Sequence, residues 1–291
     1  MSRVIKEIVK QQLHKMHMPF RKIDILRNKD GVIVARVYQN KDSVILKYFQ
    51  RKDFTREIQN YKILSELEIP TIHVISSTEN ALLLEDILCS PVYRMGTEND
   101  LADPVCARHI AKWYKKLHAK GYDYILRGGE NLYSETDFFT LHAIDEIKRR
   151  TDTQNAPAWK LIEENFTRIS SMLSKMRLTL TYNDFYYTNM IVAKDVVPFG
   201  AIMFDYNLLG KGYAYSDVRN VLSSLVPGAQ EAFLDEYGAY DPAERILDDV
   251  VSVVVSLYFA CQREQFPEWA RCILETLNTD YTGKIERMLE L

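Results

Sequence analysis

Asp184, Asn189 and Asp205 have the residue types and the spacing that phosphoryl transfer from a nucleotide requires. Asp184 and Asn189 stand in the run Thr181-Tyr-Asn-Asp-Phe-Tyr-Tyr-Thr-Asn189, and Asp205 follows the apolar run Ile202-Met-Phe. In this chemistry one carboxylate orients the acceptor hydroxyl and takes its proton, while an amide and a second carboxylate hold magnesium. The alternative is that these residues mark turns between strands. The apolar flanks and the second Asp favour catalysis.

This segment resembles the catalytic and metal-binding motifs of the aminoglycoside phosphotransferase and choline kinase superfamily, whose small-molecule kinases are related in fold to protein kinases. The resemblance implies that Asp184 is the catalytic base and that Asn189 and Asp205 are magnesium ligands. It also implies Mg²⁺ and ATP or GTP as cofactors. The expected acceptor is a small, cationic, hydroxyl-bearing molecule.

The second motif extends from Asp205 through Gly210, Asp217 and Asn220, with a phasing somewhat closer to choline and ethanolamine kinases. Tyr182 stands where the family usually has His, and its ring is expected to support the loop instead. Asn207 replaces an acidic residue usual in choline kinases, which weakens the choline interpretation only. For Asp217 the resemblance implies structural support below the catalytic loop, and helix capping is the alternative.

Lys47 and Glu57 are predicted to form a buried ion pair. Lys47 lies within an apolar strand-like run, and Glu57 shares a helical stripe with Phe54, Tyr61 and Leu64. In related kinases such a pair positions the Lys against the nucleotide phosphates. The alternative is a Lys that extends to solvent from a strand edge and a surface Glu.

Four further residues are candidates for the binding sites. Glu85 and Asp86 follow a buried strand at the position of the family's adenine-binding linker, where the backbone makes the contacts. Tyr186 and Tyr206 are candidates for cation–π contact with an amine-bearing acceptor, although both are also ordinary core aromatics. Asn28–Gly31 reads as a hairpin turn.

The expected fold is α+β and two-lobed, like a protein kinase. The N-lobe, residues 1–88, is expected to bind the nucleotide with a small antiparallel sheet and a helix. Its expected elements are a helix over residues 1–18, strands at 22–27, 32–38 and 43–49, a helix at 54–64, and strands at 71–76 and 81–84. The C-lobe, residues 89–291, is expected to be mainly helical around the catalytic loop and hairpin, with the acceptor site. Its expected helices cover 101–118, 136–149 and 159–175, and most of the chain after 216.

Charge is distributed unevenly along the 291 residues, although the net charge is only −3. Residues 1–62 carry 15 Lys and Arg against 6 Asp and Glu, and residues 231–291 carry 5 against 13. The basic N-terminal segment would attract an anionic nucleotide, and the acidic C-terminal segment, called the acidic tail below, would attract a cationic acceptor. The alternative is that both segments are ordinary solvated surfaces. The tail residues expected to attract the acceptor are Asp235, Glu236, Asp241, Asp248 and Asp249.

Several classes of protein are disfavoured by the sequence. The weak net charge gives no indication of nucleic-acid binding, and the apolar run at 250–261 is too short to cross a bilayer. The scattered cysteines and the charged N-terminus predict a cytoplasmic protein. The predicted activity is phosphoryl transfer to a hydroxyl of an amino alcohol or aminoglycoside-like acceptor, with choline or ethanolamine slightly favoured. The alternative is a catalytically silent, kinase-like binding or structural protein.

Overall fold

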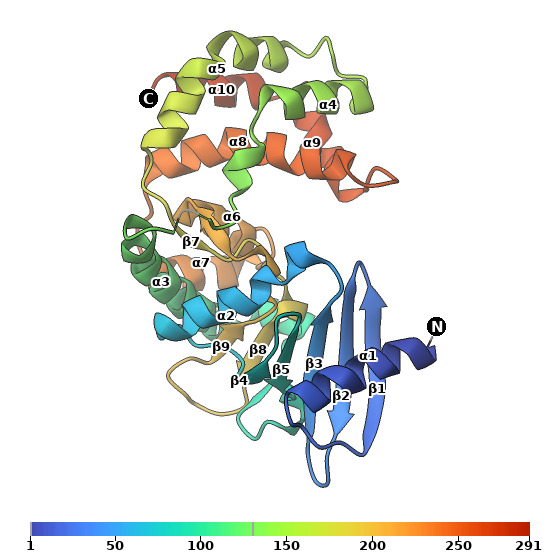
Figure 1. Ribbon diagram of the computed structural model, residues 1–291. Coiled ribbons are helices and arrows are strands. Elements are labelled where there is room, and N and C mark those ends of the chain that lie inside the picture. The colour runs from blue at the N-terminus through green and yellow to red at the C-terminus, as the bar shows by residue number, and fades with distance from the viewer. Residues whose placement is uncertain (1, 130) are drawn as a thin grey trace. The chain divides into compact units, whose positions relative to one another are not determined.

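The computed structural model describes residues 2–129 and 131–291 (Figure 1). Packing divides the chain into two compact units. The first unit runs up to Leu117 and adds Asp184–Leu209 and Val221–Gly238, and the second comprises His118–Asn183, Gly210–Asn220 and Ala239–Leu291. The lobes expected at residues 1–88 and 89–291 stay a prediction.

The first unit contains an antiparallel sheet with the strand order β1-β2-β3-β5-β4. These strands are β1 (Lys22–Lys29), β2 (Val32–Tyr38), β3 (Ser43–Phe49), β4 (Val74–Ser77) and β5 (Ala81–Glu85). Asp30 (φ 57°) and Gly31 (φ 81°) are both left-handed, as a two-residue hairpin between right-twisted strands requires. The predicted strands, in their order along the chain, and the predicted hairpin turn are confirmed.

Helix α1 (Ser2–Lys15) lies across this sheet (Figure 1). Val9 and Leu13, on one side of the helix, join a buried cluster with Ile33, Val37 and Leu46 of the sheet. The opposite side of α1 carries charged residues, so its amphipathic sequence fixes which side faces the strands.

The rest of the first unit consists of helical elements and a smaller sheet. The helical elements are η1 (Lys52–Phe54), α2 (Arg56–Glu66), η2 (Ile87–Cys89), η3 (Glu98–Ala102), the first part of α3 (Pro104–Leu126), η5 (Tyr187–Asn189), η6 (Tyr206–Leu208) and α7 (Pro227–Tyr237). The smaller sheet has the order β6-β8-β9, from β6 (Tyr93–Met95), β8 (Met190–Ala193) and β9 (Ala201–Met203). The sequence had not indicated β6, because three residues are too few to show an alternating pattern.

The second unit is mainly helical. Its short strands β7 (Thr179–Thr181) and β10 (Gly210–Gly212) pair antiparallel. Its helical elements are η4 (Glu135–Phe138), α4 (Leu141–Thr151), α5 (Pro157–Lys175), most of α6 (Ala214–Leu222), α8 (Pro242–Cys261), α9 (Trp269–Thr276) and α10 (Tyr281–Leu289). Val250 and Val254 of α8 lie in a core with Trp159 and Ile285, so the predicted buried helix at 250–261 is confirmed.

The architecture is therefore α+β, with a small antiparallel sheet and a mainly helical remainder, as the sequence predicted. Within the described part of the chain, none of the helices combines the length and the apolar character that a membrane span requires.

Candidate functional site

Lys47, Glu57 and Asp205 form a compact charged cluster in the first unit. Lys47 Nζ lies 2.6 Å from Glu57 Oε2 and 2.7 Å from Asp205 Oδ1. Glu57 is fully buried and Lys47 is 8% exposed, so both charges lie where water cannot solvate them well. The structure thus brings the predicted Lys47–Glu57 pair together and adds Asp205 to it.

The electrostatics of the cluster keep Lys47 charged. Burial by itself lowers the pKa of Lys47, but the negative charges of Glu57 and Asp205 outweigh it and raise that pKa. Burial raises the pKa of Glu57 to about 7, against the opposing attraction of Lys47. A permanently charged ammonium between two carboxylates is suited to contact phosphate oxygens.

Asp184 and Asn189 are joined directly. Asn189 Nδ2 donates to Asp184 Oδ2 at 3.0 Å and to the Asp184 carbonyl oxygen at 3.2 Å. Burial, followed by repulsion from Asp205, raises the pKa of Asp184 to about 7, while the positive charge of Lys47 opposes the shift. The charges of Asp205 and Lys47 therefore both act on this carboxyl group.

The β8–β9 hairpin explains why Asn189 and Asp205 meet. Asn189 directly precedes β8, and Met190 pairs with Met203 near the open end of the hairpin. The Phe204 amide donates to the Asn189 carbonyl at 3.0 Å, which extends this pairing by one step. Asp205 follows with φ 63° and ψ 70°, a left-handed conformation that is costly for a residue with a Cβ. Strain of this kind is typical of residues whose position matters for function.

Helix α2 holds the segment after Asp205 through residues that sequence reasoning missed. Asn60 Nδ2 donates to the Tyr206 carbonyl at 2.7 Å, and Arg56 Nε donates to the Asn207 carbonyl at 2.6 Å. The one available signal was that Asn60, three residues after Glu57, places a polar amide on the buried side of the helix. These bonds link the helix that carries Glu57 to the loop that carries Asp205.

Asp217 supports the backbone directly before Asp184 from within the second unit. Its Oδ2 accepts from the Tyr182 amide at 2.7 Å and its Oδ1 accepts from the Asn183 amide at 2.9 Å. His118 Nε2 lies 3.1 Å from Asp217 Oδ2. Asp217 and Tyr182 are fully buried, and their role in supporting the catalytic loop stays a prediction.

The two candidate tyrosines differ in their surroundings. Tyr186 is 49% exposed and packs against Tyr187, with ring centroids 4.5 Å apart. Tyr206 is fully buried, and its hydroxyl donates to the Met203 carbonyl. The prediction that Tyr206 contacts an acceptor is wrong, because its ring packs edge-on against Tyr61 and is not exposed to solvent. Tyr186 stays a candidate.

Asp86 is occupied by partners inside the first unit. Its Oδ2 accepts from Arg36 Nε at 2.5 Å and from Ser43 Oγ at 2.6 Å, and its Oδ1 accepts from the Leu88 amide at 3.2 Å. Glu85 Oε1 accepts from the His73 amide at 3.2 Å. The Asp86 carboxylate therefore shapes the segment after β5, while Glu85 links β5 to the residue before β4. Backbone groups of the segment stay the candidates for contact with a nucleotide base.

Known proteins match this chain in structure. Neither the family models nor the curated protein sequences match this chain. Among solved structures, choline kinase LicA from Streptococcus pneumoniae has 13% identity and a TM-score of 0.59, with 99% of each chain covered. Macrolide 2′-phosphotransferase MphH from Brachybacterium faecium has 13% identity and a TM-score of 0.58, with 91% of this chain and 94% of that one covered.

A spectinomycin phosphotransferase solved with ADP and spectinomycin has 10% identity and a TM-score of 0.57, with 99% of this chain and 98% of that one covered. The chain has the choline kinase and aminoglycoside phosphotransferase fold. Likeness at these identities establishes the fold alone. The three matched proteins are named as a kinase or phosphotransferases of small molecules, which agrees with the expectation from the Asp184 motif.

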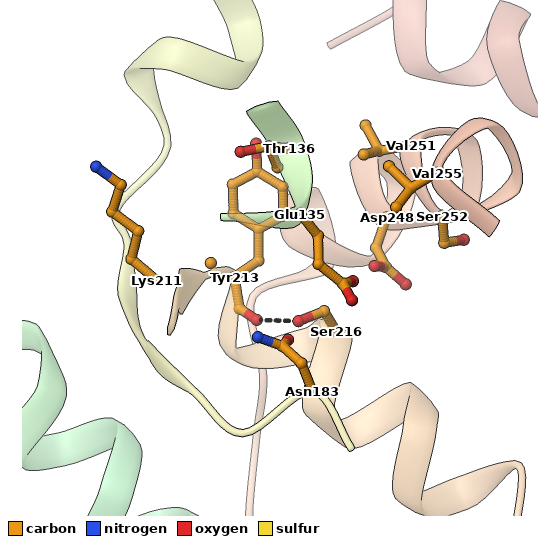
Figure 2. Close-up of a pocket in the computed structure, with 11 residues that line it drawn as sticks. Glu135, Thr136, Asn183, Lys211, Tyr213, Ser216, Asp248, Val251, Ser252 and Val255 are labelled. Carbon is orange, nitrogen blue, oxygen red and sulfur yellow. Dashed lines mark hydrogen bonds between the residues drawn. The ribbon is translucent and has the colours of Figure 1, made fainter. Parts of the chain in front are cut away.

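The second unit of this kinase-like chain contains a pocket between η4 and α8 (Figure 2). Its lining includes Asn183, Ser216, Glu135 and Asp248. Of the acidic tail residues expected near the acceptor, Asp248 thus lines a pocket. Asp241 instead caps α8 by accepting from the Ala243 amide at 2.8 Å.

Proposed function

We propose that this protein is a small-molecule kinase that transfers the γ-phosphoryl group of ATP or GTP to a hydroxyl of an amino alcohol or aminoglycoside-like acceptor. The observation that carries the proposal is the convergence of Lys47, Glu57, Asp205, Asp184 and Asn189 in one compact unit. Phosphoryl transfer depends mainly on positioning and on electrostatic stabilisation, and this set supplies both.

Asp184 has the properties of the base in this proposal. Its carboxyl group is held by Asn189 and lies within the electrostatic reach of Lys47 and Asp205, where a general base needs a fixed orientation. It would orient the acceptor hydroxyl and take its proton as the oxygen attacks the γ-phosphorus. Lys47, fixed between Glu57 and Asp205, would bind phosphate oxygens of the donor.

Asn189 and Asp205 would hold Mg²⁺. Asn189 donates through its Nδ2 to Asp184, so its amide oxygen is the atom that would bind a cation. Oxygen ligands of this kind suit a hard divalent ion. Bound there, Mg²⁺ would neutralise charge on the nucleotide phosphates. Glu85 and Asp86 would shape the linker beside the base of the nucleotide through the hydrogen bonds described above.

The test is a screen for nucleotide consumption with ATP or GTP, magnesium, and a panel of amino alcohols, aminoglycosides and sugars. We expect acceptor-dependent release of ADP or GDP that the Asp184→Asn variant loses. Calorimetric titration with a non-hydrolysable ATP analogue should be run in parallel. Nucleotide binding without turnover of any acceptor would favour a catalytically silent binding protein and overturn the proposal.

A further inference from the structure

Asp205 has a backbone conformation that costs free energy. Its φ of 63° and ψ of 70° are left-handed, which crowds the Cβ of any residue other than glycine. Such a residue persists in this conformation where the surrounding structure holds it. The ion pair with Lys47 holds one carboxylate oxygen of Asp205, but the same carboxylate is the magnesium ligand of the proposed function. Contacts to the backbone after Asp205 are therefore needed to keep this conformation when the metal is bound.

Asn60 holds both ends of the turn that follows Asp205. This turn is η6, which begins directly after Asp205 and ends directly before Leu209. Asn60 Nδ2 donates to the Tyr206 carbonyl at 2.7 Å, and it also donates to the Leu209 carbonyl at 3.4 Å. One amide group thus spans the turn from its first residue to the residue after its last.

Burial makes these bonds effective. Asn60 is 3% exposed, so water competes poorly for its amide protons. The ring of Tyr61, the next residue, packs edge-on against the ring of Tyr206, with centroids 4.8 Å apart. Arg56 lies one helical turn before Asn60 and donates from Nε to the Asn207 carbonyl at 2.6 Å. One side of α2 therefore holds the loop after Asp205 at several successive residues.

Lys47 is fixed partly by other means. Its pair with Glu57 joins β3 to α2 without the loop, so Lys47 keeps one carboxylate partner when the loop moves. The contacts of Lys47 with nucleotide phosphates should then survive a change in the loop. The binding of a metal by Asp205 should not, because it depends on where the loop places the carboxylate. These two parts of nucleotide affinity can therefore be separated by experiment.

We infer that Asn60 is a positioning residue for magnesium, because it keeps Asp205 in the left-handed conformation in which the Asp205 carboxylate binds the metal. The inference rests on the proposed function and adds to it a residue that acts through the backbone of the loop. Without the Asn60 amide, two carbonyl groups lose a donor. Relaxation of Asp205 toward an unstrained conformation would then turn its carboxylate away from the metal.

The test measures how nucleotide binding depends on magnesium. The parent protein and Asn60→Leu, which keeps a branched side chain but has no donor, are titrated with a non-hydrolysable ATP analogue by calorimetry. The titrations are made over a series of magnesium concentrations and with a chelator. We expect the magnesium concentration for half of the gain in affinity to rise by about tenfold in Asn60→Leu. Affinity in the chelator should change by less than about threefold, because Lys47 and Glu57 stay paired.

Gln230→Met is the matched control. Gln230 Nε2 donates to the Leu222 carbonyl at 2.8 Å and to the Leu225 carbonyl at 2.9 Å, so it is another amide of the first unit that joins two backbone carbonyls. Both variants should lower the free energy of unfolding, but only Asn60→Leu should shift the magnesium dependence. Arg56→Met removes the donor to the Asn207 carbonyl from a half-buried position. It should shift the dependence in the same direction, and it decides the test if Asn60→Leu does not fold.

The outcomes separate this inference from the proposed function. Equal magnesium dependence in the parent and in the folded variants of α2 overturns the inference, and so does an equal shift in Gln230→Met. Turnover by the parent protein would in both cases leave the kinase function standing. Nucleotide binding that magnesium does not strengthen in the parent overturns the inference together with the assignment of Asp205 as a ligand. A shift confined to the α2 variants, without turnover of any acceptor, supports the inference and overturns the kinase function.

Discussion

Lys47 and Glu57 form an ion pair between β3 and α2, with 2.6 Å between Lys47 Nζ and Glu57 Oε2. The pair is buried, and burial of two charges costs solvation that their mutual attraction only partly returns. The pair therefore fixes the position of the Lys47 side chain and adds little to the stability of the fold. It holds the ammonium group beside Asp205 at the open end of the β8–β9 hairpin.

Glu57→Gln should weaken nucleotide binding by about tenfold, because the charge attraction that fixes Lys47 is lost. Glu57→Ala should in addition lower the free energy of unfolding by about 3 kcal/mol, since Lys47 loses a buried partner. Calorimetric titration and urea unfolding measure the two effects. Glu66→Gln, at the exposed end of the same helix, is the control. Nucleotide affinity equal to that of the control would remove Glu57 from the site.

Asp184→Asn should lower turnover by a factor of about 10² or more, because the proton acceptor and the orienting charge are lost together. The side chain keeps its shape, so the fold and the nucleotide affinity should be preserved. Steady-state kinetics with saturating nucleotide measures the effect, and thermal unfolding checks the fold. Near-normal turnover would show that Asp184 is not the base.

Asp205→Ala should abolish the part of nucleotide affinity that depends on magnesium, because it removes an anionic oxygen ligand. It also removes a partner of Lys47, so Asp205→Asn is the matched variant that keeps the side-chain shape. Titration of each variant with an ATP analogue, with magnesium and with a chelator, separates the two effects. If added magnesium strengthens binding equally in all three proteins, Asp205 is not a ligand.

Asp217→Ala should lower the free energy of unfolding by about 2–4 kcal/mol, because the buried amides of Tyr182 and Asn183 lose their acceptor. Turnover should fall as well, since the backbone before Asp184 is released. Asp217→Asn, which keeps one acceptor oxygen, should lose less of both. Denaturant unfolding and kcat are the measurements. Equal stability of all three proteins would contradict a supporting role.

Asp86→Asn should reduce stability at neutral pH by about 1–3 kcal/mol. Burial raises the pKa of Asp86, but the hydrogen bonds from Arg36 and Ser43 outweigh it, and the pKa lies below its ordinary value of 3.8. The ionised form is therefore stabilised by folding, and its contribution is present above pH 3.8 and lost as the pH falls further.

The stability difference between Asp86→Asn and the parent protein should accordingly be constant near neutral pH and shrink below pH 3.8. Urea unfolding across this range measures it. Nucleotide affinity should stay within a factor of about two, because the linker would contact the base through its backbone. A large loss of affinity in a variant that remains folded would show that the Asp86 side chain itself contacts the nucleotide.

Local sequence patterns determined most of the elements. The alternation of apolar residues in Val32–Tyr38 and Ser43–Phe49, with Asp30 and Gly31 in the turn, predicted strands that the structure contains. The helical spacing of apolar residues in α1 and the apolar run in α8 likewise predicted helices that the structure contains. The types and spacing of Asp184, Asn189 and Asp205 also indicated the chemistry, because hairpin geometry relates Asn189 to Asp205 within 16 residues.

Contacts between distant segments were decided only by the tertiary structure. Lys47 and Asp205 are 158 residues apart, and no local pattern shows that their side chains touch. The tertiary structure also decided the hydrogen bond from Asn60 to the loop after Asp205. It decided the burial of Tyr206 as well, because the sequence around Tyr206 is compatible with a core residue and with a pocket residue. Residue type and spacing report the local period of a backbone, whereas the closeness of two remote side chains depends on how whole elements pack.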